Sequence, residues 1–175
     1  MRYFIDVILP LALKKTFTYE VSEAEFNYIQ TGMRVAVPFG KNKIYTSLVL
    51  NMHNNPPLHY VAKQIETILD ISPIINLYQI EHWKWVSEYY MCSFGEVFKG
   101  ALPSGLLLES ETIISKKNDL SFPISDLKDD EYLIYEALQL QSSISVGEIV
   151  KLLNKKNVFP VINGMLSKGA LVIQE

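Results

Sequence analysis

Two aromatic rings flank a hydroxyl in the segment KKTFTYEV, which runs from Lys14 to Val21. Phe17 and Tyr19 are two positions apart, with Thr18 between them, so on a β-strand both rings project from the same face. Two rings on one face make a stacking platform for nucleobases, and stacking contributes about 1–3 kcal/mol per base. The same rings would also serve as core residues of a small barrel, so these residues alone leave both interpretations open.

A glycine followed by lysines marks a second candidate contact, in the segment VPFGKNK. Gly40 lets the backbone approach a ligand closely, and Lys41 and Lys43 carry charges suited to a phosphate group. Lys63, at the start of a later apolar segment, offers the same charge. An ordinary hairpin turn with solvated lysines also explains these residues, so both interpretations stay open here too.

A third polar group lies near the C-terminus, where Lys155, Lys156 and Asn157 stand at the start of an expected helix. In a winged helix this is where residues that read the major groove are found. The helix itself is unusually apolar, with Phe159 and Ile162 among its side chains. Packing against another domain or protein is therefore an alternative to insertion into DNA.

The charge of the chain limits how it could bind nucleic acid. Sixteen basic and nineteen acidic side chains give a net charge of -3, which argues against a binder held by bulk positive charge. The basic residues are divided nine and seven between residues 1–105 and the remainder, against nine and ten acidic ones, so charge favours neither part. Any anion site must be local.

Several other function classes find no support in the sequence. The single Cys92 excludes an intrachain disulfide framework and a cysteine zinc site, and it fits a reducing, cytoplasmic setting. His53 and His59 share a loop, but exposed polar roles explain them better than a metal ion does. Glycine-rich phosphate-binding motifs are missing, so nothing indicates an enzyme active site. Asp6 and Pro10 interrupt the apolar N-terminal segment, which is too short to span a membrane.

The first part of the chain has the texture of a small β-structure followed by helices. Apolar and aromatic segments predict strands over 2–9, 16–21, 33–37 and 44–52, and a fifth strand begins at Ala62. Frequent turns between short strands favour an OB-like antiparallel β-barrel. Two flanking helices then follow: Asn76 with Gln79 forms the capping box of the first, and Ser93 caps the second.

The C-terminal part predicts three helices and a strand. A capping box from Ser145 to Glu148 opens the second helix, Pro160 is tolerated in the first turn of the third, and Gly169 lies at its C' position. The strand ALVIQE follows, as in a winged helix whose wing has only its first half. The expected organisation is α+β, with a barrel domain over 1–105, a linker over 106–124 and a three-helix winged-helix domain over 125–175 with a truncated wing.

The chain resembles the N-terminal region of the PriA family of replication-restart DNA helicases, also called primosomal protein N'. The segments that carry the resemblance occur in order along the chain: LPL, KTFTYEV, GMRVAVPFGKNK, AKQIETILDISPII and WKWVSEYYMCSFGEVFKGALPSG. The last of these is the most specific, because an aromatic-rich helix running into Gly-Glu-Val and Ala-Leu-Pro is hard to match by chance.

The resemblance implies a pocket for the terminal nucleotide of a DNA 3' end. In the family this pocket is formed by a Phe-Asp-Tyr strand motif, the glycine after Pro-Phe and a lysine in the last strand. The corresponding positions here are Phe17, Thr18, Tyr19, Gly40 and Lys63. Thr18 departs from the motif, since a neutral hydroxyl that both donates and accepts replaces a carboxylate.

The resemblance further implies a DNA-binding front end that recognises the free 3' end of the nascent leading strand at stalled forks, for primosome assembly in a cytoplasmic, nucleoid-associated setting. Forked DNA, other primosome proteins and single-strand-binding protein are the implied partners. ATP, magnesium and zinc are implied only for the helicase part of a longer parent. The alternative is an interaction scaffold for helicase lobes or primosome partners, with little DNA affinity of its own.

Overall fold

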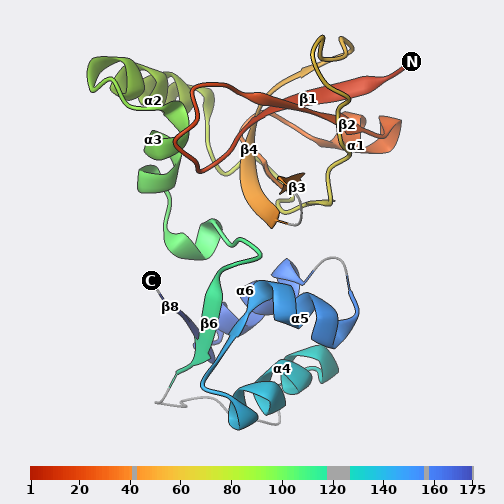
Figure 1. The fold of residues 1–175 in the computed structure, drawn as a ribbon, viewed down its shortest axis with the longest axis vertical. Helices are drawn as coiled ribbons and strands as arrows, with labels where there is room; N and C mark the ends of the chain where they lie inside the picture. Colours follow the sequence, from red (N-terminus) through yellow and green to blue (C-terminus); the bar gives the residue numbers. More distant parts are fainter. Residues whose placement is uncertain (41–42, 118–126, 156–157, 175) are drawn as a thin grey trace. The chain divides into compact units, whose positions relative to one another are not determined.

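The computed structural model describes residues 1–40, 43–117, 127–155 and 158–174 of the chain. The chain divides into two compact units, Met1–Leu107 and Leu108–Glu175 (Figure 1). Each unit combines helices with an antiparallel sheet, which confirms the α+β class.

The first unit is built around a five-stranded sheet with the order β2-β1-β4-β3-β5. Its pairings are antiparallel, and β1 faces β2 with Asp6 opposite Thr18. The elements in chain order are β1 (Tyr3–Ile8), β2 (Phe17–Val21), α1 (Glu23–Tyr28), β3 (Arg34–Phe39), β4 (Lys43–His53), β5 (Thr67–Ile68), α2 (Leu77–Tyr89), α3 (Phe94–Ala101) and a 3-10 helix (Ser104–Leu106).

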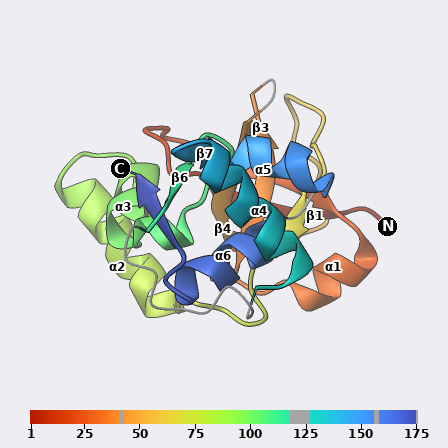
Figure 2. The ribbon, with the colours of Figure 1, turned by 90° about the horizontal axis from the view of Figure 1, so that it is seen from below.

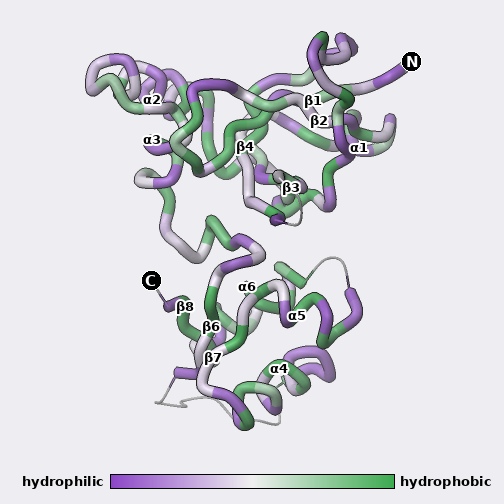
Figure 3. The backbone as a smooth tube through the Cα atoms, in the orientation of Figure 1, coloured by the Kyte–Doolittle hydropathy of each residue, from purple (hydrophilic) through white to green (hydrophobic). Residues whose placement is uncertain are grey.

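Two apolar clusters hold the first unit together. One gathers alternate side chains of the strands, among them Ile5, Val37 and Tyr19, as strand periodicity requires. The other lies under α2 and α3, where Trp83 and Phe98 pack with residues of β1 and β4. Hydrophobic and hydrophilic residues alternate along the tube of α2 (Figure 3). Of its side chains Ile80 and Trp83 are buried, as in a helix that buries only one side.

Local hydrogen bonds start the helices of the first unit as the sequence predicts. The Asn76 side chain accepts from the backbone N–H of Gln79 at 2.9 Å, and Ser93 forms the same kind of box with Glu96. A third box, between Ser22 and Glu25, begins α1, a helix that the sequence analysis did not assign.

The fifth strand is shorter than expected. The ladder with β3 covers only Thr67 and Ile68, because the chain before it follows the other edge of the sheet. There the N–H of Glu20 donates to the carbonyl of Lys63 at 2.9 Å, and Glu20 bridges Gln64. Within the described residues this is an isolated bridge rather than a ladder, so the closed OB-like barrel stays a prediction.

A buried ion pair joins β3 to the segment after β5. The guanidinium of Arg34 lies 2.6 Å from Asp70 Oδ1, and the side chains are only 8% and 6% exposed. Asp70 also accepts from the backbone N–H of Arg34, and the guanidinium donates to the carbonyl of Leu106. These bonds satisfy the charges on both sides, as burial requires.

The second unit is a three-stranded sheet with the order β7-β6-β8 and three helices (Figure 2). Its core includes Ile114, Ile134, Ile149 and Ile162, which are all fully buried. The elements are β6 (Ile113–Lys116), α4 (Asp129–Leu140), β7 (Ser143–Ser145), α5 (Val146–Leu153), α6 (Phe159–Ser167) and β8 (Leu171–Gln174).

The linker expected over 106–124 is wrong for residues 113–116, which form β6 at the centre of this sheet. The strand pairs with β7 and β8, so its partners lie far along the chain and left no local signal. Part of the expected linker, 118–124, lies outside the described residues. The strand expected after α6 is present as β8, with Gly169 in the left-handed conformation before it (φ 71°).

Candidate nucleic-acid interface

A pocket of about 330 Å³ opens at the edge of the five-stranded sheet. Three separate segments line it: 17–19 from β2, 38–40 at the end of β3, and 60–63 from the loop before β5. The lining residues are Phe17, Thr18, Tyr19, Pro38, Phe39, Gly40, Tyr60, Val61 and Lys63. All five residues that the resemblance assigns to a terminal-nucleotide pocket therefore lie around one cavity.

The pocket exists because β2 is paired on one side only. The backbone N–H groups of Thr18 and Glu20 point away from β1, toward the free edge of the strand. The Glu20 N–H is satisfied by the Lys63 carbonyl, whereas the Thr18 N–H donates to the hydroxyl of Tyr60 at 2.7 Å. At Thr18 a side chain, that of Tyr60, replaces the backbone carbonyl as the acceptor, so the backbone of the loop lies farther from β2 there than at Glu20, and the cavity lies between the two segments.

The two rings of β2 are buried to different degrees. Tyr19 is 4% exposed and belongs to the core, and its hydroxyl donates to the carbonyl of Pro38 at 3.0 Å. Burial, and then the neighbouring Tyr60 hydroxyl, raises the pKa of Tyr19 to about 12. Phe17 is partly buried and meets Phe39 edge to face, with ring centroids 4.9 Å apart. Both rings pack against the core and also line the pocket.

Thr18 is held by a carboxylate from the neighbouring strand. Its hydroxyl donates to Asp6 Oδ1 at 2.7 Å, and His53 Nε2 lies 3.1 Å from the same oxygen. The backbone N–H of Asn55 donates to His53 Nδ1, and the other ring nitrogen, Nε2, faces Asp6. Because its proton is committed to Asp6, the Thr18 oxygen is left with lone pairs that accept hydrogen bonds.

This pairing also gives a physical reason for the departure from the Phe-Asp-Tyr motif. An aspartate at position 18 would lie directly opposite Asp6 in the strand register. Like charges in directly opposed positions of a sheet destabilise it. Threonine avoids that repulsion while keeping an oxygen at the same place.

Gly40 and Lys63 connect the two rims of the pocket. Gly40 has a φ of 70°, a left-handed conformation that favours glycine at the turn after β3. The ammonium group of Lys63 donates to the Gly40 carbonyl at 3.0 Å. The exposed Lys43 is not among the lining residues, and Lys41 lies outside the described residues.

The candidate DNA contacts of the second unit have acidic neighbours. Lys155 forms an ion pair with Asp130, and Lys168 lies 2.6 Å from Glu131 Oε2. Burial acts to raise the pKa of Glu131, but hydrogen bonds from Lys168 and from the backbone of Lys128 outweigh it and lower the value. Lys156 and Asn157 lie outside the described residues.

Tyr60, Pro38, Phe39 and Val61 are pocket residues that the sequence analysis did not single out. Tyr60 follows a polar segment that reads only as a loop, and its contact with Thr18 spans 42 residues. An aromatic residue three positions before Lys63 was the available signal.

Neither a metal centre nor a membrane-spanning helix is found in the described part of the chain. Among the described residues, no three His, Cys, Asp or Glu side chains gather as ligands for a metal ion. The helices in the described ranges are all too short or too polar to cross a membrane.

Comparison with known proteins assigns both units. The family model described as the 3'DNA-binding domain (3'BD) of PriA matches residues 6–103, and a winged helix domain model matches residues 111–175. Neither is a helicase domain.

Similar proteins carry one name, replication restart protein PriA. The relative from Rickettsia conorii is 26% identical over 93% of this chain and 22% of its own length. Those from Treponema pallidum and Haemophilus influenzae are 23% and 29% identical, over 59% and 67% of this chain and 16% of each relative. The chain thus spans about a fifth of the length of these relatives or less. The chain belongs to the PriA family, with that family's 3'DNA-binding domain followed by a winged helix domain.

Proposed function

We propose that this chain recognises the free 3' end of a DNA strand and holds its terminal nucleotide in the pocket at the edge of β2. The observation that carries the proposal is the convergence of Phe17, Thr18, Tyr19, Gly40 and Lys63 around one cavity. The volume of about 330 Å³ lies at the lower end of the roughly 300–1,000 Å³ typical of small-ligand pockets, which suits a single nucleotide.

Each wall of the pocket offers a contact that a terminal nucleotide needs. The rings of Phe17 and Phe39 offer apolar surface to the base, which is sequence-tolerant because every base has a π-face. The ammonium group of Lys63 offers a charge to the phosphate that joins the last nucleotide to the strand. Thr18 lines the pocket along the free edge of β2, where its backbone N–H donates to the Tyr60 hydroxyl at 2.7 Å.

A blocked end should be rejected because the cavity is small and largely aromatic. A 3'-phosphate adds bulk to a volume of about 330 Å³. It also brings a charge of roughly -1.5 to -2 at neutral pH against the rings of Phe17, Tyr19 and Phe39, and burying a charge beside apolar groups is costly. A strand that continues past the pocket meets the same restriction.

The test compares two single strands of one sequence, one with a 3'-hydroxyl and one with a 3'-phosphate, by fluorescence anisotropy. We expect the hydroxyl-ended strand to bind at least several-fold more tightly. Equal affinities for the two ends would refute the proposal.

In this reading the chain is the DNA-binding part of a protein that restarts replication at stalled forks, with an OB-like barrel as its first domain. Unwinding of DNA driven by ATP, a magnesium or zinc requirement, and assembly with primosome proteins or single-strand-binding protein are properties we propose only for a longer parent. A cytoplasmic, nucleoid-associated setting belongs to the same proposal.

A second candidate function applies to the winged helix domain. Lys155 and Lys168 flank α6, and their ion pairs with Asp130 and Glu131 reduce the positive charge that they could offer to phosphates. This favours contact with protein, either helicase lobes or a primosome partner, over insertion into a DNA groove. The second unit should then add little to the DNA affinity of the first. A double variant of the whole chain, Lys155→Ala with Lys168→Ala, should therefore bind DNA as the unchanged chain does.

A further inference from the structure

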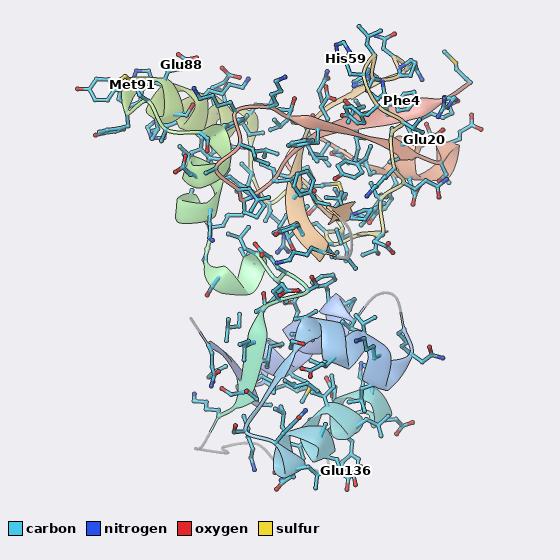
Figure 4. The ribbon with its side chains drawn as sticks, in the orientation of Figure 1. Phe4, Glu20, His59, Glu88, Met91 and Glu136 are labelled. Carbon is cyan, nitrogen blue, oxygen red and sulfur yellow. The ribbon has the colours of Figure 1, made fainter. Side chains whose placement is uncertain are left out.

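Tyr60 closes the pocket from a position to which the family motif assigns no role. Its hydroxyl accepts the free-edge N–H of Thr18 at 2.7 Å, in the place where the next backbone carbonyl of a strand would stand. The side chain thereby ties the loop to β2, beyond the point where the Glu20–Lys63 backbone bond ends. His59, the preceding residue, lies at the same end of the first unit as Phe4 and Glu20 (Figure 4).

The exposure of Tyr60 is unusual for a residue whose hydroxyl is already satisfied. The side chain is 48% exposed, and the next residue, Val61, is 86% exposed. Both line the pocket. A tyrosine in this position adds little to the folded core, but its ring faces the cavity. The ring is held at one end by the backbone of the loop and at the other by the hydrogen bond between its hydroxyl and Thr18.

The other aromatic walls come from different elements, Phe17 from β2 and Phe39 from β3. Tyr60 adds a ring from the loop, so a flat ligand in the cavity meets aromatic surface from more than one segment. Nucleobases fit this arrangement because they are flat and each has two π-faces.

We propose that Tyr60 stacks on the base of the terminal nucleotide, and that the hydrogen bond to Thr18 holds its ring in the stacking position. The inference rests on the proposed function, and it assigns base contact to a residue outside the Phe-Thr-Tyr, glycine and lysine set. It also predicts that the pocket needs a base and not only a sugar with a free hydroxyl.

The test is a double-mutant cycle between the protein and the DNA. Wild type and Tyr60→Ala are each titrated with a strand ending in a normal 3' nucleotide and with one ending in an abasic 3' residue that keeps the hydroxyl. Tyr60→Phe keeps the ring without the hydroxyl. Tyr28→Ala is the matched control, because Tyr28 is 46% exposed in the same unit and does not line the pocket.

We expect Tyr60→Ala to weaken binding of the normal end roughly 5- to 160-fold, the factor that corresponds to loss of one stacking contact. Binding of the abasic end should change less than twofold, and Tyr60→Phe should fall between wild type and Tyr60→Ala. Tyr28→Ala should bind as wild type does.

Three results would overturn the inference. If wild type binds the 3'-hydroxyl end and Tyr60→Ala binds it equally well, the inference fails and the proposed function stands. If Tyr60→Ala weakens the normal and abasic ends by the same factor, Tyr60 supports the loop and does not touch the base. Failure of wild type to prefer the 3'-hydroxyl end would instead remove the proposed function and the inference together.

Discussion

Replacing Lys63 with methionine tests whether its charge meets a phosphate or only ties the loop to the turn. Methionine keeps most of the length of the side chain and removes both the charge and the hydrogen bond to the Gly40 carbonyl. Lys63 is exposed, so its attraction to a phosphate acts across water and is worth about 1 kcal/mol at 4 Å. We expect roughly fivefold weaker binding of a 3'-hydroxyl strand at low salt.

The dependence on salt separates the two roles of Lys63. Each phosphate contact on a single strand contributes about -0.7 to the slope of log affinity against log salt concentration. Lys63→Met should therefore flatten the slope by about 0.7, and its deficit should shrink roughly 2.6-fold between about 50 and 200 mM salt. The assay is anisotropy over that range, with Lys99→Met as the control for an exposed lysine that does not line the pocket. Parallel slopes for wild type and Lys63→Met would refute the phosphate contact.

Three further changes test the packing around the site. Asp70→Ala should lower the free energy of unfolding by about 3–5 kcal/mol in denaturant titrations, because it leaves the Arg34 guanidinium buried without its partner. Thr18→Asp should lower the melting temperature through repulsion from Asp6, and adding Asp6→Asn should restore most of it. The pKa of Glu131 is lowered from an ordinary 4.5. The stability that this carboxylate contributes should therefore be fully present above pH 4.5 and should be lost as the pH falls through the lowered pKa. The free energy of unfolding of Glu131→Gln should depend less on pH in that range.

Each of these expectations has a clear contrary outcome. Glu81→Ala removes an exposed partner of Lys84 and should cost less than about 1 kcal/mol, so an equal loss in Asp70→Ala would deny the special role of the buried pair. Thr18→Asp that melts as wild type does would show that Asp6 does not exclude a second carboxylate. An unchanged acid unfolding curve for Glu131→Gln would place the acid-sensitive group elsewhere.

The sequence predicted those parts of the fold that depend on neighbouring residues. The capping boxes at Asn76 and Ser145 join residues three apart, so their hydrogen bonds are visible in the order of residue types. The same signal was present at Ser22, but α1 covers only six residues and shows no helical periodicity over so short a range.

The parts that failed depend on partners far along the chain. Strand β6 was read as linker because its pairing with β8 joins residues more than fifty positions apart. The shortened β5 results from the loop following the edge of β2, which only the folded chain defines. Exposed aromatic residues also mislead, since Tyr60 lines the pocket whereas Tyr78 of α2 is 87% exposed and does not line it.

The candidate site shows the same division. The family motif pointed to residues of β2, of the turn after β3 and of the loop before β5, because all of them keep their order along the chain and all but Thr18 keep their type. The motif did not indicate Asp6 or Tyr60. Asp6 contacts Thr18 across the pairing of β1 with β2, and Tyr60 contacts Thr18 through its hydroxyl from 42 residues away. Both contacts form only once the chain is folded.

The pocket at the edge of β2 should take the terminal nucleotide of a 3'-hydroxyl end. Amide chemical shifts of the whole chain can be followed while a short single strand that ends in a 3'-hydroxyl is added. We predict that the largest changes fall at residues 17–19, 39–40 and 60–63, and that a 3'-phosphate strand leaves them nearly unchanged. Changes confined to α4 and α6 of the second unit, or equal changes with both strands, would contradict it.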